Sequence, residues 1–233
     1  METFCKPSSL TRALAIKDVI LYASDFDIAN YSDELYSLTN TARPLDFENS
    51  VIKRRAEFLC GRITAKKALS EFSSSNHQII VGNGREPIFP KTIIGSITHS
   101  NQTALCALAS SSKLKYLGID LEPKIDQVIV TQIEQQIISL KERHVIEDCG
   151  LDFGTAFTLV FSAKESLFKA LYPQVSEFFD FDAARLTSIC PTRKIIEFVL
   201  TRNLASNIPR GMRISGKFYI DNLRVLTTIY KHE

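Results

Sequence analysis

The chain has 233 residues, of which 45% are hydrophobic and 23% charged, and this is the composition of an ordinary folded protein with ample material for a core. Its 28 Lys and Arg and 26 Asp and Glu give a formal net charge of +2. This balance argues against a dedicated nucleic-acid-binding protein, because such proteins carry a strong basic bias.

The five cysteines are widely spaced and contain no C-x-x-C pair, so we expect neither a disulfide framework nor a zinc knuckle. The N-terminal segment lacks the apolar core of a signal peptide, and the longest uncharged stretch is too polar for a membrane span. We therefore expect a cytoplasmic protein with reduced thiols and no transmembrane segment.

The first 45 residues show short apolar runs but no clear periodic element. A helical spacing of apolar residues begins near Phe47, with Asn49 or Ser50 as the N-cap, and continues to about Phe72. Strands are predicted next, over Ile79–Val81, Thr103–Ala109 and Lys115–Leu121.

The second half of the chain begins with helices and ends in alternating segments. We predict one helix over 131–148, with Gly150 just beyond it, and another from Phe153 to Tyr172 that stops at Pro173. Strands follow over Ile195–Leu200, Arg213–Ile220 and Leu223–Tyr230. Each side of about Lys115 thus holds a long helix and antiparallel strands, which predicts an α+β fold, although no sequence repeat supports a duplication.

Two acidic residues lie close together in the segment Gly118-Ile119-Asp120-Leu121-Glu122-Pro123. Residues two apart on a strand point to the same face, so the carboxylates of Asp120 and Glu122 would repel each other unless a cation or proton intervenes. Mg²⁺ is the natural occupant of such an oxygen-rich site. A solvated strand end is the alternative, and the spacing alone favours it.

The third helix carries a polar stripe on an otherwise apolar sequence. Thr158, Ser162, Glu165 and Lys169 follow one another at helical spacing. The stripe is either an exposed face with an ordinary Glu–Lys pair or the lining of a cleft, and the residues alone favour the exposed face.

Candidate phosphate-binding groups precede the acidic segment. The first helix carries Arg54 and Arg62 among other basic residues, and Arg85 lies at a turn. A segment of small and hydroxyl residues, with Thr98 and His99, comes just before a strand. Guanidinium, hydroxyl and imidazole groups suit phosphate oxygens, but solvated surface and a structural histidine are the commoner explanations.

The segments RRAEFLCGR, GREPIFP, GSITHS, GIDLEP and FSAKESLFKA occur in an order that resembles the 4′-phosphopantetheinyl transferase superfamily, within its surfactin-type or enterobactin synthase component D-like group. The patterns G-I-D-x-E and K-E-x-x-x-K, about forty residues apart, are specific in combination. The chain departs from the family pattern at Phe161, where Trp is usual, and at Thr98, where Ser is common.

The resemblance implies two pseudo-symmetric halves, residues 1–115 and 116–233, each a long helix on a small antiparallel sheet, with the active site and coenzyme A in the cleft between them. It implies Mg²⁺ held by Asp120, Glu122 and Glu165, and phosphate contacts from Lys164 and Lys169. The nucleotide and its 3′-phosphate would be surrounded by Arg54, Arg62, Arg85, Thr98 and His99.

The implied reaction is attack by a serine of an apo carrier protein on the β-phosphate of coenzyme A, with 3′,5′-ADP leaving. Glu165 is the candidate base and Lys169 the second catalytic group. Glu165 would then be both a metal ligand and the base, and a second carboxylate or a metal-bound water could take over the base role. We expect a monomer acting in siderophore or other nonribosomal peptide biosynthesis, with peripheral association to a synthetase complex left open.

Three other functions remain open from the sequence. A general holo-acyl-carrier-protein synthase for fatty-acid synthesis would use the same site. A non-catalytic coenzyme A-binding module would not need the full acidic set. An unrelated Mg²⁺-dependent phosphohydrolase would need no protein acceptor.

Overall fold

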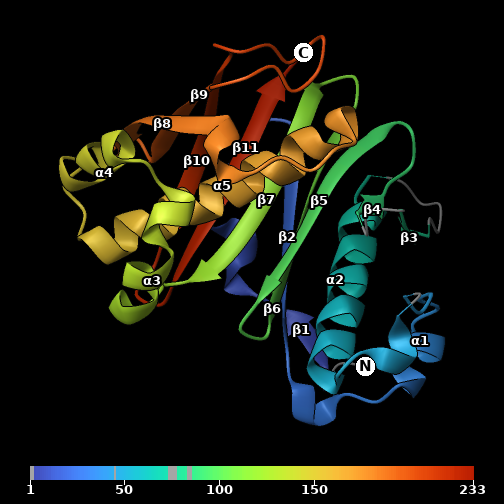
Figure 1. Ribbon diagram of the computed structural model, residues 1–233. Coiled ribbons are helices and arrows are strands. Elements are labelled where there is room, and N and C mark those ends of the chain that lie inside the picture. The colour runs from blue at the N-terminus through green and yellow to red at the C-terminus, as the bar shows by residue number, and fades with distance from the viewer. Residues whose placement is uncertain (1–2, 45, 73–77, 83–85) are drawn as a thin grey trace. The chain divides into compact units, whose positions relative to one another are not determined.

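The computed structural model describes residues 3–44, 46–72, 78–82 and 86–233. It divides into two compact units, unit 1 with residues 1–114 and unit 2 with residues 115–233 (Figure 1). Each unit combines helices with a sheet in which neighbouring strands run antiparallel, so the predicted α+β class is confirmed at this level.

Unit 1 is built on a four-stranded sheet with the order β1-β2-β6-β5. The strands of this sheet are β1 (Cys5–Pro7), β2 (Val19–Phe26), β5 (Ile93–Ser100) and β6 (Thr103–Ser110). The remaining elements of the unit are the helices α1 (Glu34–Leu38) and α2 (Ile52–Ser70) and the short strands β3 (Ile80–Val81) and β4 (Pro87–Ile88). Helix α2 packs along β6, β2 and β5.

Burial of apolar side chains explains why β6 lies inside the sheet of unit 1. Strand β6 is an almost unbroken apolar run and lies between two other strands, as expected for a strand covered on its faces. The absence of an element before residue 45 was a wrong prediction, because β2 pairs with β6 along its length although only its first four residues are strongly apolar. Near the middle of α2 the Cys60 sulfur lies 3.4 Å from the Cys5 sulfur of β1, and all five cysteines are free thiols.

Unit 2 is built on a five-stranded sheet with the order β7-β11-β10-β9-β8. The strands are β7 (Leu114–Pro123), β8 (Ala184–Cys190), β9 (Ile195–Leu200), β10 (Arg213–Ile220) and β11 (Arg224–His232). The helices are α3 (Gln127–Ile137), α4 (Leu140–Glu147) and α5 (Phe153–Val175). Figure 1 shows α5 lying across one face of this sheet.

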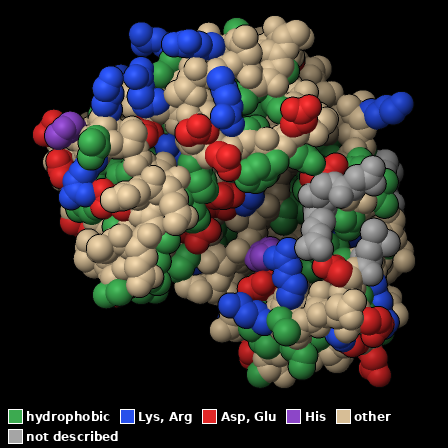
Figure 2. Space-filling view, in the orientation of Figure 1, with side chains coloured by type: hydrophobic (Ala, Val, Ile, Leu, Met, Phe, Trp, Pro, Cys, Tyr) green, Lys and Arg blue, Asp and Glu red, His purple; other side chains and the backbone are tan. Residues whose placement is uncertain are grey.

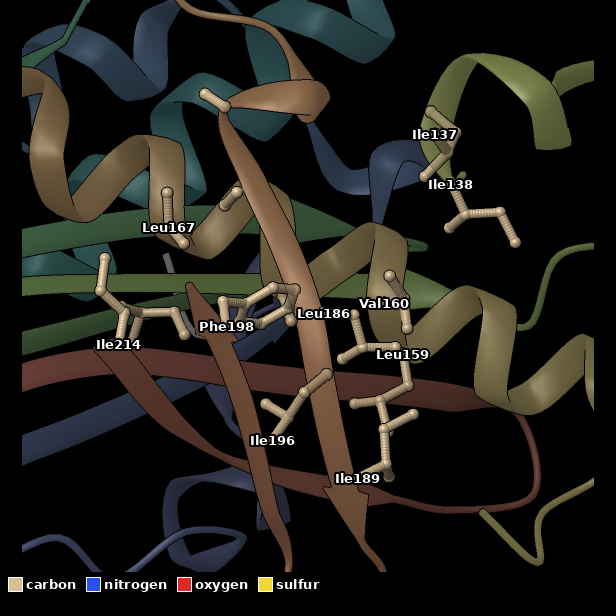
Figure 3. Close-up of a cluster of buried hydrophobic side chains, with 14 of the residues drawn as sticks. Ile137, Ile138, Leu159, Val160, Leu167, Leu186, Ile189, Ile196, Phe198 and Ile214 are labelled. Atoms are coloured by element: carbon tan, nitrogen blue, oxygen red, sulfur yellow. The ribbon is translucent and has the colours of Figure 1, made fainter. Parts of the chain in front are cut away.

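The core of unit 2 forms between α5 and the sheet. Figure 3 shows Leu159, Val160 and Leu167 of α5 pointing toward apolar side chains of β8 and β9, among them Leu186 and Phe198, and all five are buried. Burial of a large apolar side chain contributes about 1.5–3 kcal/mol. This packing fixes α5 on the sheet and therefore fixes the polar residues that α5 carries.

Two predicted helix boundaries in unit 2 were wrong. The helix predicted over 131–148 is two helices, because Ser139 caps α4 in a capping box with Glu142 and so starts a new helix. Helix α5 does not stop at Pro173 but ends at Val175, followed by Ser176 in the left-handed conformation (φ 57°). In the part of the chain that the structure describes, no helix combines the length and apolar character needed to span a membrane.

Candidate active site

The acidic end of β7 lies directly against α5. Gly118 makes this possible, since a Cβ atom there would come within 2.0 Å of the Ser166 carbonyl oxygen and 2.5 Å of the Ala170 nitrogen. Only glycine allows the two backbones to come this close. The close approach places the next same-face residue of β7, Asp120, beside the middle of α5.

Asp120 is buried and both of its carboxylate oxygens have partners on α5. The Ser162 hydroxyl donates to Oδ2 at 2.9 Å, and the Lys169 Nζ donates to Oδ1 at 2.6 Å. The Lys169 side chain keeps 30% of its surface exposed, whereas that of Asp120 keeps 4%. The pair therefore stands at the boundary between the interior and the surface.

Glu122 and Glu165 complete an acidic cluster around this pair. The pKa of Glu122 is raised to about 7, chiefly by burial and then by the negative charges of Asp120 and Glu165, and Lys169 partly opposes the shift. Burial also raises the pKa of Glu165, with Asp120 adding to the shift and Lys169 opposing it. Figure 2 shows acidic side chains reaching the surface on the face where α5 lies, and both glutamates are partly exposed.

A small pocket adjoins the acidic cluster within unit 2. It measures about 100 Å³, and its lining includes Lys164, Glu165, Phe168, Phe178, Phe179 and Phe181. The lining thus combines aromatic walls with the charged residues Lys164, Glu165 and Asp180, and apolar walls with a few polar groups are typical of a small-molecule site.

Lys164 precedes Glu165 in the chain but points elsewhere. Its Nζ lies 2.7 Å from Glu142 Oε1 and donates to the Ile137 carbonyl oxygen at 2.7 Å, and both charged side chains are almost fully buried. Burial lowers the pKa of Lys164, and Glu142 opposes that shift. Glu142 also accepts from the Leu186 nitrogen at 2.9 Å, so the pair joins α5 to α4 and β8.

Unit 1 holds a separate polar group formed by α2 and β5. Arg54 Nη1 lies 3.3 Å from His99 Nε2, and His99 Nδ1 lies 3.7 Å from Glu57 Oε2. Arg54 is exposed, and His99 is partly exposed. The guanidinium and imidazole together form a surface feature suited to an anion.

Comparison with known proteins decides the family. A family model described as the 4′-phosphopantetheinyl transferase N-terminal domain matches residues 43–109, and one for the 4′-phosphopantetheinyl transferase superfamily matches residues 116–209. Enterobactin synthase component D of Salmonella typhi is 35% identical over 173 residues, which cover 74% of this chain and 70% of the relative. The chain belongs to the 4′-phosphopantetheinyl transferase superfamily.

Two further relatives carry the family name. The 4′-phosphopantetheinyl transferase PptT of Mycobacterium tuberculosis is 28% identical over 222 residues, 90% of this chain and 95% of the relative. The 4′-phosphopantetheinyl transferase Npt of Nocardia iowensis is 30% identical over 140 residues, 59% of this chain and 61% of the relative. As a 4′-phosphopantetheinyl transferase, the protein is an enzyme that transfers the phosphopantetheine group to carrier proteins.

The structure of this transferase brings together only part of the predicted site. Asp120 and Lys169 are in direct contact, and Glu122 and Glu165 interact electrostatically with both of them. Lys164 is turned into the interior toward Glu142, away from that group. The predicted phosphate contact of Lys164 therefore has no support from its position.

Of the residues predicted to bind the nucleotide of coenzyme A, the structure brings only some together. Arg54 and His99 are in contact, whereas Thr98 is buried and, as the preceding residue of β5, faces the opposite side of the sheet. Arg62 is 6% exposed, with its guanidinium 4.8 Å from the centre of the Phe58 ring, so its role as a ligand stays a prediction. Arg85 lies outside the described residues.

The donor chemistry of the transferase's acidic cluster fits Mg²⁺. Asp120, Glu122 and Glu165 offer hard carboxylate oxygens, and the two glutamates have a raised pKa mainly because burial penalises their charged form, which a bound cation would stabilise. Over residues 3–44, 46–72, 78–82 and 86–233, no three acidic, histidine or cysteine side chains are arranged closely enough to hold a metal ion in this conformation. The cluster thus supplies the ligand types, while Lys169 is the cation that contacts Asp120 in this conformation.

Several residues that shape the transferase site were not predicted. Glu142 and Glu57 are the partners of a predicted lysine and a predicted histidine, and Gly118 sets the distance between β7 and α5. Thr227 of β11 contacts the Ser162 hydroxyl at 2.9 Å. A capping-box pattern at Ser139 and Glu142 was visible in the sequence, but the other contacts join distant parts of the chain and leave no local signal.

Proposed function

We propose that the enzyme transfers 4′-phosphopantetheine from coenzyme A to a serine of an apo peptidyl or aryl carrier domain, in the biosynthesis of a siderophore or another nonribosomal peptide. Similarity to enterobactin synthase component D over most of both chains supports the pathway. The observation that carries the chemistry is the joining of Asp120, Glu122, Glu165 and Lys169 where β7 meets α5.

The acidic cluster would hold Mg²⁺ through Asp120, Glu122 and Glu165. When bound, the ion would offset negative charge on the pyrophosphate of coenzyme A during the transfer. Lys169 would turn its partly exposed ammonium to the phosphate oxygens, because Asp120 would then share its charge with the ion.

Glu165 would act as the general base. Its raised pKa gives the carboxylate a higher proton affinity than an ordinary glutamate, as the removal of a proton from a serine hydroxyl requires. The serine oxygen forms a bond to the β-phosphorus, the bond from that phosphorus to the leaving oxygen breaks, and 3′,5′-ADP departs. The proton of the serine goes to Glu165.

The aromatic pocket beside Glu165 would take an apolar part of the pantetheine arm. Its lining includes four phenylalanines, and its position next to the proposed base would keep the arm close to the phosphorus that it accompanies. Arg54 and His99 would bind the 3′-phosphate. One coenzyme A drawing on residues of both units, and the relation of the two halves by pseudo-symmetry, stay predictions.

Intact-mass spectrometry of carrier proteins tests this proposal. Apo peptidyl, aryl and fatty-acid acyl carriers are each incubated with the enzyme, coenzyme A and Mg²⁺. We expect a gain of one phosphopantetheine, about 340 Da, on the peptidyl or aryl carrier at the highest rate, and its loss when EDTA is added.

Three outcomes would contradict parts of the proposal. A higher rate on the fatty-acid carrier would indicate a general holo-acyl-carrier-protein synthase. Free phosphopantetheine without carrier modification would indicate hydrolysis. Near-normal transfer by an Asp120→Ala variant would remove Asp120 from the proposed metal site.

A further inference from the structure

A chain of three buried hydroxyl groups ends on the carboxylate of Asp120. Ser162 Oγ lies 2.9 Å from Asp120 Oδ2 and 2.9 Å from Thr227 Oγ1, and Ser166 Oγ lies 2.7 Å from Thr227 Oγ1. Ser162, Ser166 and Thr227 are fully buried. The chain begins on α5, passes through β11 and returns to α5 before it reaches β7.

The hydrogen bond to Asp120 fixes which hydroxyl is the donor between Thr227 and Ser162. Ser162 donates its single hydrogen to Asp120, so Thr227 must donate to Ser162. Thr227 then has no second hydrogen to give to Ser166. The single Ser166 hydrogen is shared between Thr227 Oγ1 at 2.7 Å and the Thr227 carbonyl oxygen at 3.1 Å. Thr227 therefore fixes the rotation of the Ser162 hydroxyl, and that hydroxyl holds Oδ2 of Asp120.

This order determines how Asp120 presents its second oxygen. With Oδ2 held by Ser162, the carboxylate directs Oδ1 toward Lys169 at the partly exposed side of the site. Without Thr227 the Ser162 hydroxyl would lose the partner that orients it. Asp120 would then lose a fixed orientation, although no residue that touches it directly had changed.

We propose that Thr227 is a positioning residue for the transfer reaction, acting through Ser162 to hold the Asp120 carboxylate in the orientation that binds the metal ion. This rests on the proposed function, since it concerns the carboxylate that would bind Mg²⁺. Mutation of a residue that hydrogen-bonds to a metal ligand commonly lowers metal affinity or activity about 10- to 100-fold.

Chain position supplies a matched control. Thr228 follows Thr227 on β11, is 1% exposed and points to the other face of the strand. A Thr→Val change removes a hydroxyl at nearly constant volume at either position. The two variants therefore carry the same substitution in one strand, and only one of them breaks the chain to Asp120.

The test measures Mn²⁺ binding, as a probe for Mg²⁺, by calorimetry in the presence of coenzyme A, together with kcat and the KM for the carrier. For Thr227→Val we expect about tenfold weaker Mn²⁺ binding and a lower kcat at an unchanged carrier KM. Thr227→Ser keeps the hydroxyl and should restore both values, and Thr228→Val should resemble the unchanged enzyme.

Other outcomes separate the possible failures. Wild-type Mn²⁺ affinity in Thr227→Val would overturn the positioning role, whereas a lack of carrier modification by the unchanged enzyme would instead overturn the proposed function. If Thr227→Val does not fold, Ser162→Ala and Ser166→Ala replace it. We then expect the larger loss of Mn²⁺ affinity for Ser162→Ala, and equal effects would overturn the proposed order.

Discussion

Lys164 and Lys169 lie on the same helix, and their surroundings give them different roles. Lys164 is 2% exposed and paired with Glu142, whereas Lys169 is 30% exposed and paired with Asp120. A buried charge left without its partner is costly, because the low dielectric of the interior penalises it. Lys164 therefore supports the fold, and Lys169 stands where a substrate phosphate can meet it.

A methionine substitution at each lysine tests this difference. Lys164→Met should lower the free energy of unfolding by about 3–5 kcal/mol, because it leaves the Glu142 carboxylate buried and unpaired. Lys169→Met should cost less stability, because Asp120 keeps the Ser162 hydrogen bond, but it should abolish most transfer. Urea unfolding and carrier modification are measured for both variants.

The opposite pattern would reverse the assignment. A Lys164→Met enzyme that is as stable as the unchanged protein but has a raised KM for coenzyme A would place Lys164 at the phosphates. The phosphate contact of Lys164, which the family resemblance implies, stays a prediction that this measurement tests.

Gly118 has no Cβ atom and so allows the close contact between β7 and α5. The acidic site depends on this contact. In Gly118→Ala the new Cβ would meet backbone atoms of α5, which cannot turn away as a side chain can. We expect a loss of about 3 kcal/mol or more in the free energy of unfolding, with transfer activity strongly reduced.

Gly154→Ala, on the helix α5 that Gly118 contacts, is the control for this substitution. The nearest atom to its added Cβ is 3.7 Å away, and alanine favours a helix over glycine by about 0.5–1 kcal/mol. Thermal unfolding should show Gly154→Ala at or above the midpoint of the unchanged enzyme. A Gly118→Ala variant with the same midpoint would contradict the close contact.

At the level of elements, the strongly periodic segments were predictable and the less regular ones were not. Helix α5 and strand β7 carry long apolar patterns and were found close to their predicted bounds. Strand β8 was missed because its register shifts between Leu186 and Ser188, which interrupts the alternation of apolar and polar residues in a short segment. The break between α3 and α4 was missed because helical periodicity continues through Ile137 and Ile138 into α4.

Within the site, the charged residues could be predicted from the sequence, and the hydroxyl residues that hold them in position could not. Asp120, Glu122, Glu165 and Lys169 were predicted because the G-I-D-x-E and K-E-x-x-x-K patterns resemble the family, whereas their spacing alone favoured solvated surface. The hydroxyl of Thr227 gave no signal, because a threonine in a strand is ordinary and its partner Ser162 is distant in sequence.

For the whole molecule, the proposed ligands of coenzyme A separate by unit. The metal and pyrophosphate groups belong to unit 2, whereas Arg54 and His99 belong to unit 1. The substrate itself has two separated anionic ends, a pyrophosphate and a 3′-phosphate. Changes in unit 1 should therefore affect the recognition of coenzyme A more than the chemical step.

Comparing two donors tests this division. With Arg54→Ala or His99→Ala we expect the KM for coenzyme A to rise about tenfold or more, since a hydrogen bond to a charged group contributes ~1.5–3 kcal/mol. The KM for 3′-dephospho-coenzyme A should change little, and kcat should be retained. An unchanged preference between the donors would remove both residues from the 3′-phosphate.

The close contact between the thiols of β1 and α2 makes unit 1 sensitive to oxidation. The Cys5 and Cys60 sulfurs are 3.4 Å apart, and a disulfide bond of about 2.05 Å would need only a modest approach. Exchange with an oxidised glutathione would join them and release two reduced glutathione molecules. Such a bond would tie the first strand covalently to the helix that carries Arg54, so the redox history of a preparation is a variable in any measurement of coenzyme A affinity.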